Sequence, residues 1–270
     1  MPSIVRYALT GIVLLAFLAV NPMAAALDIT VDGSLSDWGV ATPTQVNGNN
    51  WTPTAEVEAW WSEDSVGSNG YVGPGYGGQN SDIEAMFAYL DGSNLYIAIA
   101  TGLEQSGLPW GSRTFKPGDV FLDFGMDGWD TAVGVGGAHA AGNVYTGTGT
   151  WWTNPDADQF PGTGQYAANT ALATRIYPNA QVVYTDTRPG TETSDRWNDH
   201  NIIELCLGLS ESQLASLYDN GMAIHWTLQC GNDVANLNYH PERNVVPEPA
   251  SLLLMGLGLA GVVTRKLKKK

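Results

Sequence analysis

Several short segments of the chain alternate apolar and polar residues with a period of two. This pattern is typical of β-strands that bury one face, since successive side chains of a strand point to opposite sides. The segment 94–101 is the clearest, with Leu95, Ile97 and Ile99 on one side. Further strands are predicted at 82–90, 119–124, 181–185, 202–207 and 223–230. The chain is therefore expected to build most of its core from strands.

The strands 82–90 and 94–101 are separated by Asp-Gly-Ser-Asn at residues 91–94. An Asp-Gly pair between two alternating segments favours a tight hairpin turn, because glycine adopts the positive φ angles that such turns need. We therefore expect these two strands to form an antiparallel hairpin. The alternation along the first of them predicts one face made of Ile83, Ala85, Phe87 and Tyr89.

The sequence clearly predicts only one helix. Ser210 is a typical N-cap, and Gln213 follows three residues later, so the two can satisfy free N–H groups at a helix start. Leu214 and Leu217 form an apolar side, and Gly221 ends the pattern. The chain is thus expected to contain a single short helix between two late strands.

Long loops rich in Gly, Asn and Pro lie between the predicted strands. The stretches 67–78 and 134–149 hold many glycines and are expected to be loops or irregular sheet edges. Short strands joined by such loops fit an all-β fold. We predict a two-sheet antiparallel β-sandwich with one short late helix and long Gly- and Trp-rich loop inserts.

The charges of the chain are unevenly distributed. The whole chain has 12 basic and 27 acidic side chains, a formal net charge of −15. Five of the basic residues lie within 265–270, whereas residues 27–246 hold six basic and 26 acidic side chains, a net charge of −20. Such a body repels the phosphates of nucleic acids, so we expect no nucleic-acid partner.

Residues 1–26 have the organisation of a secretory signal peptide. Arg6 supplies a positive start, residues 9–20 are mostly apolar, and the small residues from Ala24 to Ala26 suit signal peptidase. The alternative is an uncleaved membrane anchor, for which the apolar run is short. We therefore expect signal peptidase to cut after Ala26, and the body to be exported.

The C-terminal end carries a second export feature. Pro247-Glu248-Pro249 precedes a short apolar stretch, and Arg265 and Lys266 open a terminal basic cluster. Membrane physics alone predicts a C-terminal anchor with its basic residues on the cytoplasmic side. The order of the three parts also resembles the PEP-CTERM sorting signal of Gram-negative bacteria. This resemblance implies processing by an exosortase, a transient anchor in the inner membrane, and a final place at the cell surface or in the extracellular matrix.

The chain thus divides into five predicted parts. They are a signal peptide at 1–26, a β-sandwich body at 27–240, a linker with the Pro-Glu-Pro motif at 241–249, a transmembrane sorting helix at 250–264 and a cytoplasmic basic tail at 265–270.

Four segments of the body carry a further resemblance. Residues 29–38 contain Asp-Gly-Ser-Leu-Ser-Asp-Trp, which resembles the first strand and turn of DOMON-like domains and family-9 carbohydrate-binding modules. Residues 89–97 resemble the hairpin of these domains, and residues 203–209 are similar to their late strand and helix. Residues 225–233 resemble a segment of other PEP-CTERM sandwich proteins. Together they imply a DOMON-like β-sandwich.

Oxygen-bearing residues near both ends of the body form a candidate metal site. Asp32 and Asp37 lie on a predicted turn, and Asn232 and Asp233 follow a predicted strand. If the two ends of the sandwich lie side by side, these residues offer part of the set of about six to eight oxygens that Ca²⁺ binds. The alternative is that Asp32 and Asp37 accept hydrogen bonds from backbone N–H groups of their own turn.

The only two cysteines, Cys206 and Cys230, both lie in the exported part and in predicted strands. Because disulfides form in oxidising compartments, we predict a Cys206–Cys230 bridge. Two buried thiols are the alternative, since spacing alone does not fix a pairing.

Tryptophans gather in or beside the Gly-rich loops. A flat indole ring stacks well on the apolar face of a sugar, so these residues predict a site for extracellular polysaccharide. The alternative is that they pack as the core of the loop inserts. The candidates are Trp51, Trp110, Trp129, Trp151 and Trp152.

No catalytic motif stands out in the sequence, so no catalytic residue is predicted. We expect a non-enzymatic protein of the cell surface or extracellular matrix. Two alternatives stay open. One is a secreted glycoside hydrolase that uses a carboxylate pair such as Glu56 and Glu58, and the other is a structural matrix component without a ligand.

Overall fold

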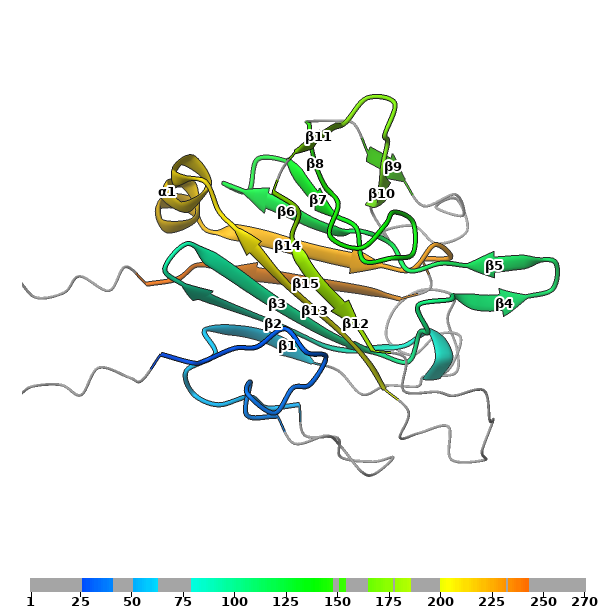
Figure 1. Cartoon of the computed structure of the whole chain (residues 1–270), viewed down its shortest axis with the longest axis horizontal. Coiled ribbons are helices and arrows are strands. Elements are labelled where there is room, and N and C mark those ends of the chain that lie inside the picture. The colour runs from blue at the N-terminus through cyan, green and yellow to red at the C-terminus, as the bar shows by residue number, and fades with distance from the viewer. Residues whose placement is uncertain are drawn as a thin grey trace, which may run out of the picture.

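The computed structural model describes residues 26–40, 51–62, 79–147, 151–153, 165–176, 178–185, 200–231 and 233–242. Two large antiparallel sheets dominate this part of the chain (Figure 1). Two smaller two-stranded sheets and one α-helix complete it. The prediction of an antiparallel β protein with a single α-helix is therefore confirmed for the described residues.

The first large sheet has five strands in the order β1-β2-β3-β13-β12. The predicted hairpin joins its second and third strands, and Gly92 in the turn has a φ of 60°. The strands are β1 (Ala59–Ser62), β2 (Ile83–Asp91), β3 (Asn94–Thr101), β12 (Gln181–Tyr184) and β13 (Asn201–Gly208).

Strand β2 departs from the predicted alternation at its start. The pairing of β2 with β3 shifts register between Ile83 and Ala85. A bulge inserts one extra residue and so reverses the alternation beyond it. Ile83 therefore packs with Met86 in the core between the sheets, whereas Ala85 and Phe87 pack on the outer face. The prediction that Ile83 shares a face with Ala85, Phe87 and Tyr89 was wrong for this reason.

The second large sheet has six strands in the order β11-β8-β7-β6-β14-β15. One of them, β8 (Val144–Thr146), lies inside the stretch 134–149 that was predicted to be loops or irregular sheet edges. A strand of three residues is too short to show alternation. The strands are β6 (Val120–Phe124), β7 (Thr131–Val133), β8 (Val144–Thr146), β11 (Thr174–Ile176), β14 (Met222–Thr227) and β15 (Val234–Tyr239).

The helix α1 (Glu211–Asn220) forms where the sequence predicts it. The Ser210 hydroxyl accepts from the backbone N–H of Gln213, and the Gln213 side chain accepts from the backbone N–H of Ser210. Gly221 follows the last turn with a φ of 83°. Both ends of the helix are thus fixed by the residues that signalled them.

The core has three layers. The main cluster lies between the two large sheets and includes the fully buried Ile97, Leu122 and Trp226. A second cluster lies on the outer face of the five-stranded sheet, under residues 27–40. A third lies on the outer face of the six-stranded sheet, around Phe121. Each large sheet therefore buries side chains on both of its faces.

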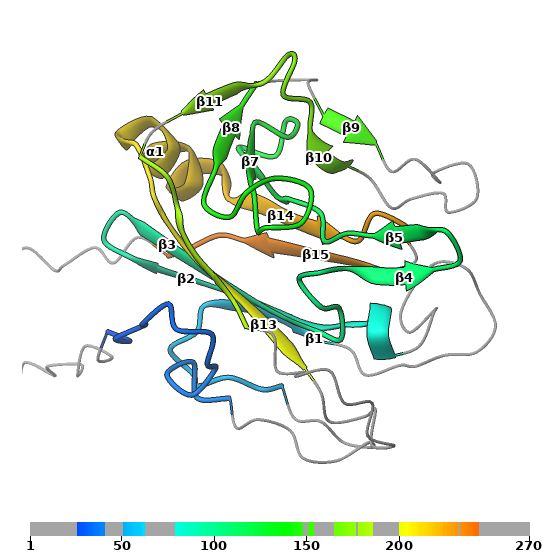
Figure 2. The same ribbon diagram turned by 45° about the vertical axis from the view of Figure 1, so that its right-hand side comes forward.

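Two small strand pairs and a short 3-10 helix, η1 (Gln79–Ser81), lie outside the large sheets. The hairpin of β4 (Leu108–Trp110) and β5 (Arg113–Phe115) projects from one end of the sandwich (Figure 2). The pair of β9 (Trp151–Thr153) and β10 (Gln165–Ala168) packs on the outer face of the six-stranded sheet. Both pairs lie away from α1 in the two views.

Candidate functional site

Residues 27–40 cross the outer face of the five-stranded sheet, and we call this segment the amino-terminal cover (Figure 1, dark blue). Its Trp38 is fully buried, and the indole donates a hydrogen bond of 2.7 Å to the carboxylate of Glu204, on β13. The same carboxylate accepts from the backbone N–H of Asp32 at 3.0 Å and of Gly33 at 2.6 Å. One buried acid therefore ties the cover to the sheet.

The surroundings of Glu204 shift the pKa of its carboxyl group. Burial raises the pKa of this carboxyl, and the three hydrogen bonds from the cover partly oppose the shift because they stabilise the charged form. The nearby charge of Asp37 raises the pKa further. The acid is thus a structural acceptor, placed by the fold opposite three N–H groups.

Asp32 and Asp37, the first two predicted calcium ligands, accept hydrogen bonds from backbone N–H groups of their own segment. Asp32 accepts a hydrogen bond from the N–H of Ser34 at 2.8 Å, and Asp37 accepts from the N–H of Thr30 at 2.7 Å. These contacts match the turn-capping alternative weighed for the two residues.

Asp233 occupies a different place, just before β15, with its carboxylate buried. One oxygen accepts from the N–H of Ile83 in β2 at 2.6 Å, and the other from the N–H of Val234 at 2.7 Å. Burial, and then the neighbouring carboxyl of Asp82, raise the pKa of Asp233 to about 7. This side chain therefore links the two large sheets.

The predicted calcium ligands thus do not form one group in the part of the chain that the structure describes. Asn232 lies outside the described residues. Within them, no three His, Cys, Asp or Glu side chains are arranged to hold a metal ion. Calcium binding by this chain stays a prediction.

The prediction of a Cys206–Cys230 disulfide was wrong, because both cysteines are free thiols in the structure. Leu205 and Leu207 of β13 point into the core between the sheets, so Cys206 between them lies on the opposite face. There it hydrogen-bonds to the side chain of Tyr96, and burial raises the pKa of its thiol. Cys230 is buried in the core between the sheets. The five-stranded sheet therefore separates the two sulfur atoms, which the sequence spacing does not reveal.

The five predicted sugar-binding tryptophans separate into three kinds. Trp51 is buried under the five-stranded sheet, with its ring edge-on to His200 at 5.0 Å between centroids. Trp129 and Trp151 are half-buried against Phe121, with the Trp151 indole donating to the Trp129 carbonyl at 2.8 Å. By contrast, the exposed fraction is 71% for Trp110 and 59% for Trp152.

The two exposed tryptophans stand on the two small strand pairs. Trp110 ends β4 at the turn of the β4–β5 hairpin, and Trp152 is the middle residue of β9. The half-buried Trp151 is the first residue of β9, and with Trp129 it packs on the cluster around Phe121, next to Trp152. Of the predicted set, only Trp110 and Trp152 thus present most of the indole to a ligand.

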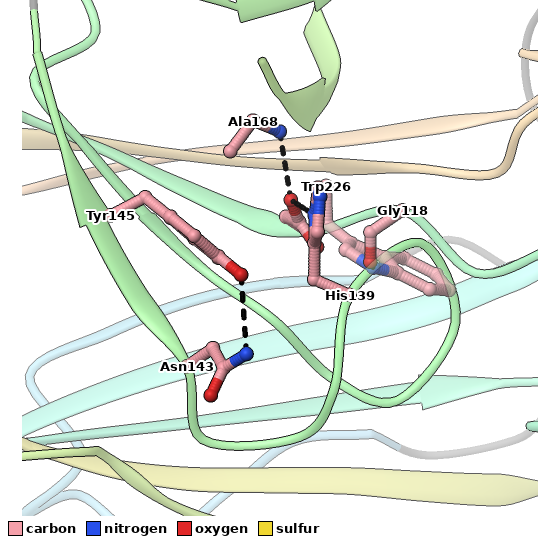
Figure 3. A network of polar contacts seen from close by, with 7 residues as sticks. Gly118, His139, Asn143, Tyr145, Ala168 and Trp226 are labelled. Carbon is pink, nitrogen blue, oxygen red and sulfur yellow. Dashed lines mark hydrogen bonds and ion pairs between the residues drawn. The ribbon is translucent and has the colours of Figure 1, made fainter. Parts of the chain in front are cut away.

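A polar network that the sequence did not single out holds the β9–β10 pair in place (Figure 3). The carboxylate of Asp119, which is fully buried, accepts from the N–H of Ala168 in β10 at 2.8 Å. The same oxygen lies 2.7 Å from Nδ1 of His139, in the loop after β7. Burial, and then the negative charge of Asp119, raise the pKa of Tyr166 to about 12.

The residues around this network leave little room for change. The Trp226 indole donates to the carbonyl of Gly118 at 3.1 Å, next to Asp119. A side chain at Gly118 would meet the carbonyl oxygens of Thr227 at 2.4 Å and Tyr166 at 2.7 Å. Glycine is therefore required where the backbones of β6, β10 and β14 come together.

The Asp119–His139 pair resembles part of a catalytic triad only in its chemistry. A triad needs a nucleophile hydrogen-bonded to the second ring nitrogen. Within the described residues, no Ser, Thr or Cys side chain is bonded to Nε2 of His139. The pair connects β10 to a loop, and no spacing motif marks it because 20 residues separate its members.

The comparisons with known proteins concern the C-terminal end of the chain. The model of the PEP-CTERM protein-sorting motif matches residues 245–269. This match indicates an exported protein that an exosortase sorts and processes, with a transient, membrane-associated C-terminal signal. It is consistent with a cell-surface or extracellular location in Gram-negative bacteria. No curated protein matches the chain.

Other expectations about the ends and the family stay predictions. In the part of the chain that the structure describes, no helix is long and apolar enough to cross a membrane. The predicted sorting helix at 250–264, the basic residues Arg265 and Lys266, and nearly all of the signal peptide lie outside that part. The β-rich fold is compatible with the DOMON-like resemblance, which none of the comparisons shows.

Proposed function

We propose that this exported, exosortase-sorted protein is a non-enzymatic component of the cell surface or extracellular matrix that binds polysaccharide through Trp110 and Trp152. The observation that carries the proposal is the exposure of these two indoles, 71% and 59%, in a protein whose other described tryptophans are more enclosed. Aromatic side chains that carry a polar group are enriched at binding interfaces. Tryptophan in particular stacks on the apolar faces of sugar rings.

The way in which the two indoles are held also supports binding. Trp152 lies between Trp151, which packs on Phe121, and Thr153, in a strand paired with β10. Trp110 is held in a hairpin by its pairing with Arg113. Both backbones are thus positioned before a ligand arrives, which lowers the entropy cost of binding. Loops and hairpins held by a rigid sandwich are common places for recognition.

The charge of the body indicates the class of polysaccharide. Residues 27–246 carry a net charge of −20, so an anionic polymer is repelled at low ionic strength. Stacking on indole rings does not need charge on the sugar. We therefore expect the body to prefer uncharged polysaccharide.

The experiment that tests this function is affinity electrophoresis of the full chain in detergent. The gels contain either the uncharged extracellular polysaccharide of the bacterium that makes the protein or, for comparison, alginate. We expect the uncharged polymer to retard the native chain and alginate to leave its mobility unchanged. Each of Trp110→Ala and Trp152→Ala is expected to weaken retardation about 5- to 10-fold, the effect of about 1 to 1.4 kcal/mol.

Leu172→Ala is the matched control, because Leu172 is 65% exposed but not aromatic. This variant is expected to bind like the native chain. Binding that survives the Trp110→Ala, Trp152→Ala double variant would refute the assigned site. If the native chain is not retarded by the host polymer, the protein is a structural component without this ligand. If the polymer is shortened during the assay, the protein is a hydrolase.

A further inference from the structure

The amino end of the cover is bound to the body at its first residue after the predicted signal-peptidase site. The backbone N–H of Leu27 donates a hydrogen bond of 3.0 Å to the hydroxyl of Tyr89, on β2. The Leu27 side chain is half-buried and packs with the outer cluster of the five-stranded sheet, to which the buried Ile29 also belongs. The docked segment therefore begins where cleavage is expected to end the signal peptide.

The groups around the Tyr89 hydroxyl are acidic. Burial raises the pKa of Tyr89, and the negative charges of Asp91, Glu58 and Glu56 add to this shift. Asp91 ends β2, whereas the two glutamates belong to the segment that leads into β1. The Tyr89 ring also lies 6.5 Å from Tyr96 of β3, whose pKa is raised by burial first and, among smaller causes, by the charge of Asp28.

Among the described residues, the charges that shift the pKa of Tyr89 are all negative. Glu58 already accepts a hydrogen bond from the Tyr239 hydroxyl, and it is also repelled by Glu242. Burial raises the pKa of Glu58, which shows that this carboxyl is incompletely stabilised as an anion. A positive charge at Leu27 would thus lie beside the Tyr89 hydroxyl oxygen, in the negative field of Asp91, Glu58 and Glu56 that acts on this tyrosine.

We propose that this place receives the new amino terminus that signal peptidase creates at Leu27. The cut adds one water molecule across the Ala26–Leu27 peptide bond and leaves a carboxylate on Ala26 and an amine on Leu27. The amine takes up a proton at neutral pH, so the neutral N–H at Tyr89 becomes an ammonium group with three donors. The processed chain is then more stable than the unprocessed one, and removal of the signal peptide completes the docking of the cover.

The expected effect is modest because some of the carboxyl groups are exposed to solvent and screened by salt. We expect the ammonium group at Leu27 to raise the melting temperature of a domain of this size by about 2–4 °C. Its dependence on pH has a definite sign. A raised pKa of the α-amine gives stability that is fully present below the unfolded value of about 7.7–8 and is lost as the pH rises through the folded value.

The test compares chains that end at residue 270, in detergent, and differ only at the amino end. One begins at Leu27, one retains Ala25 and Ala26, and one begins at an acetylated Leu27, which keeps the N–H but loses the charge. At pH 7 we expect the first to melt about 2–4 °C above the other two. The difference is expected to vanish at pH 10.5 and to shrink in 1 M salt, which screens charges beyond about 3 Å.

Tyr89→Phe removes the hydroxyl acceptor and is expected to reduce the advantage of the Leu27 end by at least half. Tyr96→Phe is the matched control, since the Tyr96 hydroxyl is bonded to Cys206 and not to Leu27. Equal melting temperatures of the three ends at pH 7 would overturn the proposal, as would a difference that persists at pH 10.5. So would an exported protein whose first residue, found by terminal sequencing, is not Leu27. Polysaccharide binding plays no part in these readouts.

Discussion

The two outer faces of the sandwich are covered in different ways. On the five-stranded sheet, Glu204 holds the amino-terminal cover through one indole and two backbone N–H groups, and Trp38 is fully enclosed. On the six-stranded sheet, Asp119 holds β10 through one backbone N–H and a histidine ring, and Trp152 beside it stays 59% exposed. One buried carboxylate thus fixes each cover, but only the second cover presents an aromatic ring to solvent. The first completes the core, and the second is where we place recognition.

The largest effect is expected from Glu204→Ala. It leaves the buried Trp38 indole and two partly buried backbone N–H groups without an acceptor, and should lower the free energy of unfolding by roughly 4 kcal/mol. Urea unfolding followed by tryptophan fluorescence measures the loss. Glu204→Gln keeps one acceptor oxygen and should cost less than half as much. A loss below about 1 kcal/mol for the alanine variant would show that Glu204 does not hold the cover.

A third buried carboxyl, Asp233, joins the two sheets instead of a cover, and its effect is expected to depend on pH. The folded pKa of about 7 lies above the usual 3.8, so the folded chain binds more protons between these values. Stability should therefore fall as the pH rises from about 4 to about 7, by an amount on the order of 3 kcal/mol, and then level off. Urea midpoints from pH 4 to pH 8 measure this slope.

The variant Asp233→Asn tests this dependence of stability on pH, and Asp127→Asn is its matched control. The first removes the titrating group and is expected to flatten the slope, whereas the second changes an exposed carboxyl and should preserve it. An unchanged slope in Asp233→Asn would assign the pH dependence to another group.

A smaller loss is expected from Asp119→Ala, which deprives Ala168 and His139 of their acceptor. We expect a cost of roughly 2 kcal/mol, together with faster hydrogen exchange in β10 than in the amino-terminal cover. Asp127→Ala removes an exposed carboxyl beyond the other end of β6 and should change stability by less than about 0.5 kcal/mol. Equal acceleration in both covers would mean that Asp119 does not act on β10 in particular.

The smallest effect on stability is expected from Trp152→Ala. Because most of this indole is exposed, its removal should change the free energy of unfolding by less than about 0.5 kcal/mol. The same variant is expected to lose affinity for polysaccharide, so stability and binding separate at this residue. A loss of more than about 2 kcal/mol in a thermal or urea melt would instead give Trp152 a role in the core.

The features that the sequence predicted are local ones. The hairpin turn at Gly92 and the helix caps at Ser210 and Gly221 depend on residues a few positions apart, and all three are found. The covers depend on distant partners. Gly33 and Glu204 are 171 residues apart, and Ala168 and Asp119 are 49 apart. No periodicity connects such positions, so the roles of the two acids became visible only in the fold.

The candidate site shows the same limit. The sequence identified Trp110 and Trp152 but could not separate them from Trp51, because a loop tryptophan that covers a core and one that faces solvent have the same local surroundings. Likewise, Cys206 and Cys230 both lie near late strands, and only the direction of each side chain relative to the five-stranded sheet separates them. The PEP-CTERM motif could be identified because it is a continuous segment with a fixed order.

Hydrogen exchange of the full chain in detergent, with and without the uncharged extracellular polysaccharide of its host, tests the difference between the two covers most directly. We predict that the polymer slows exchange in the peptides that contain 108–115 and 151–153 and leaves residues 27–40 unchanged. Protection confined to residues 27–40, or protection nowhere, would contradict the account.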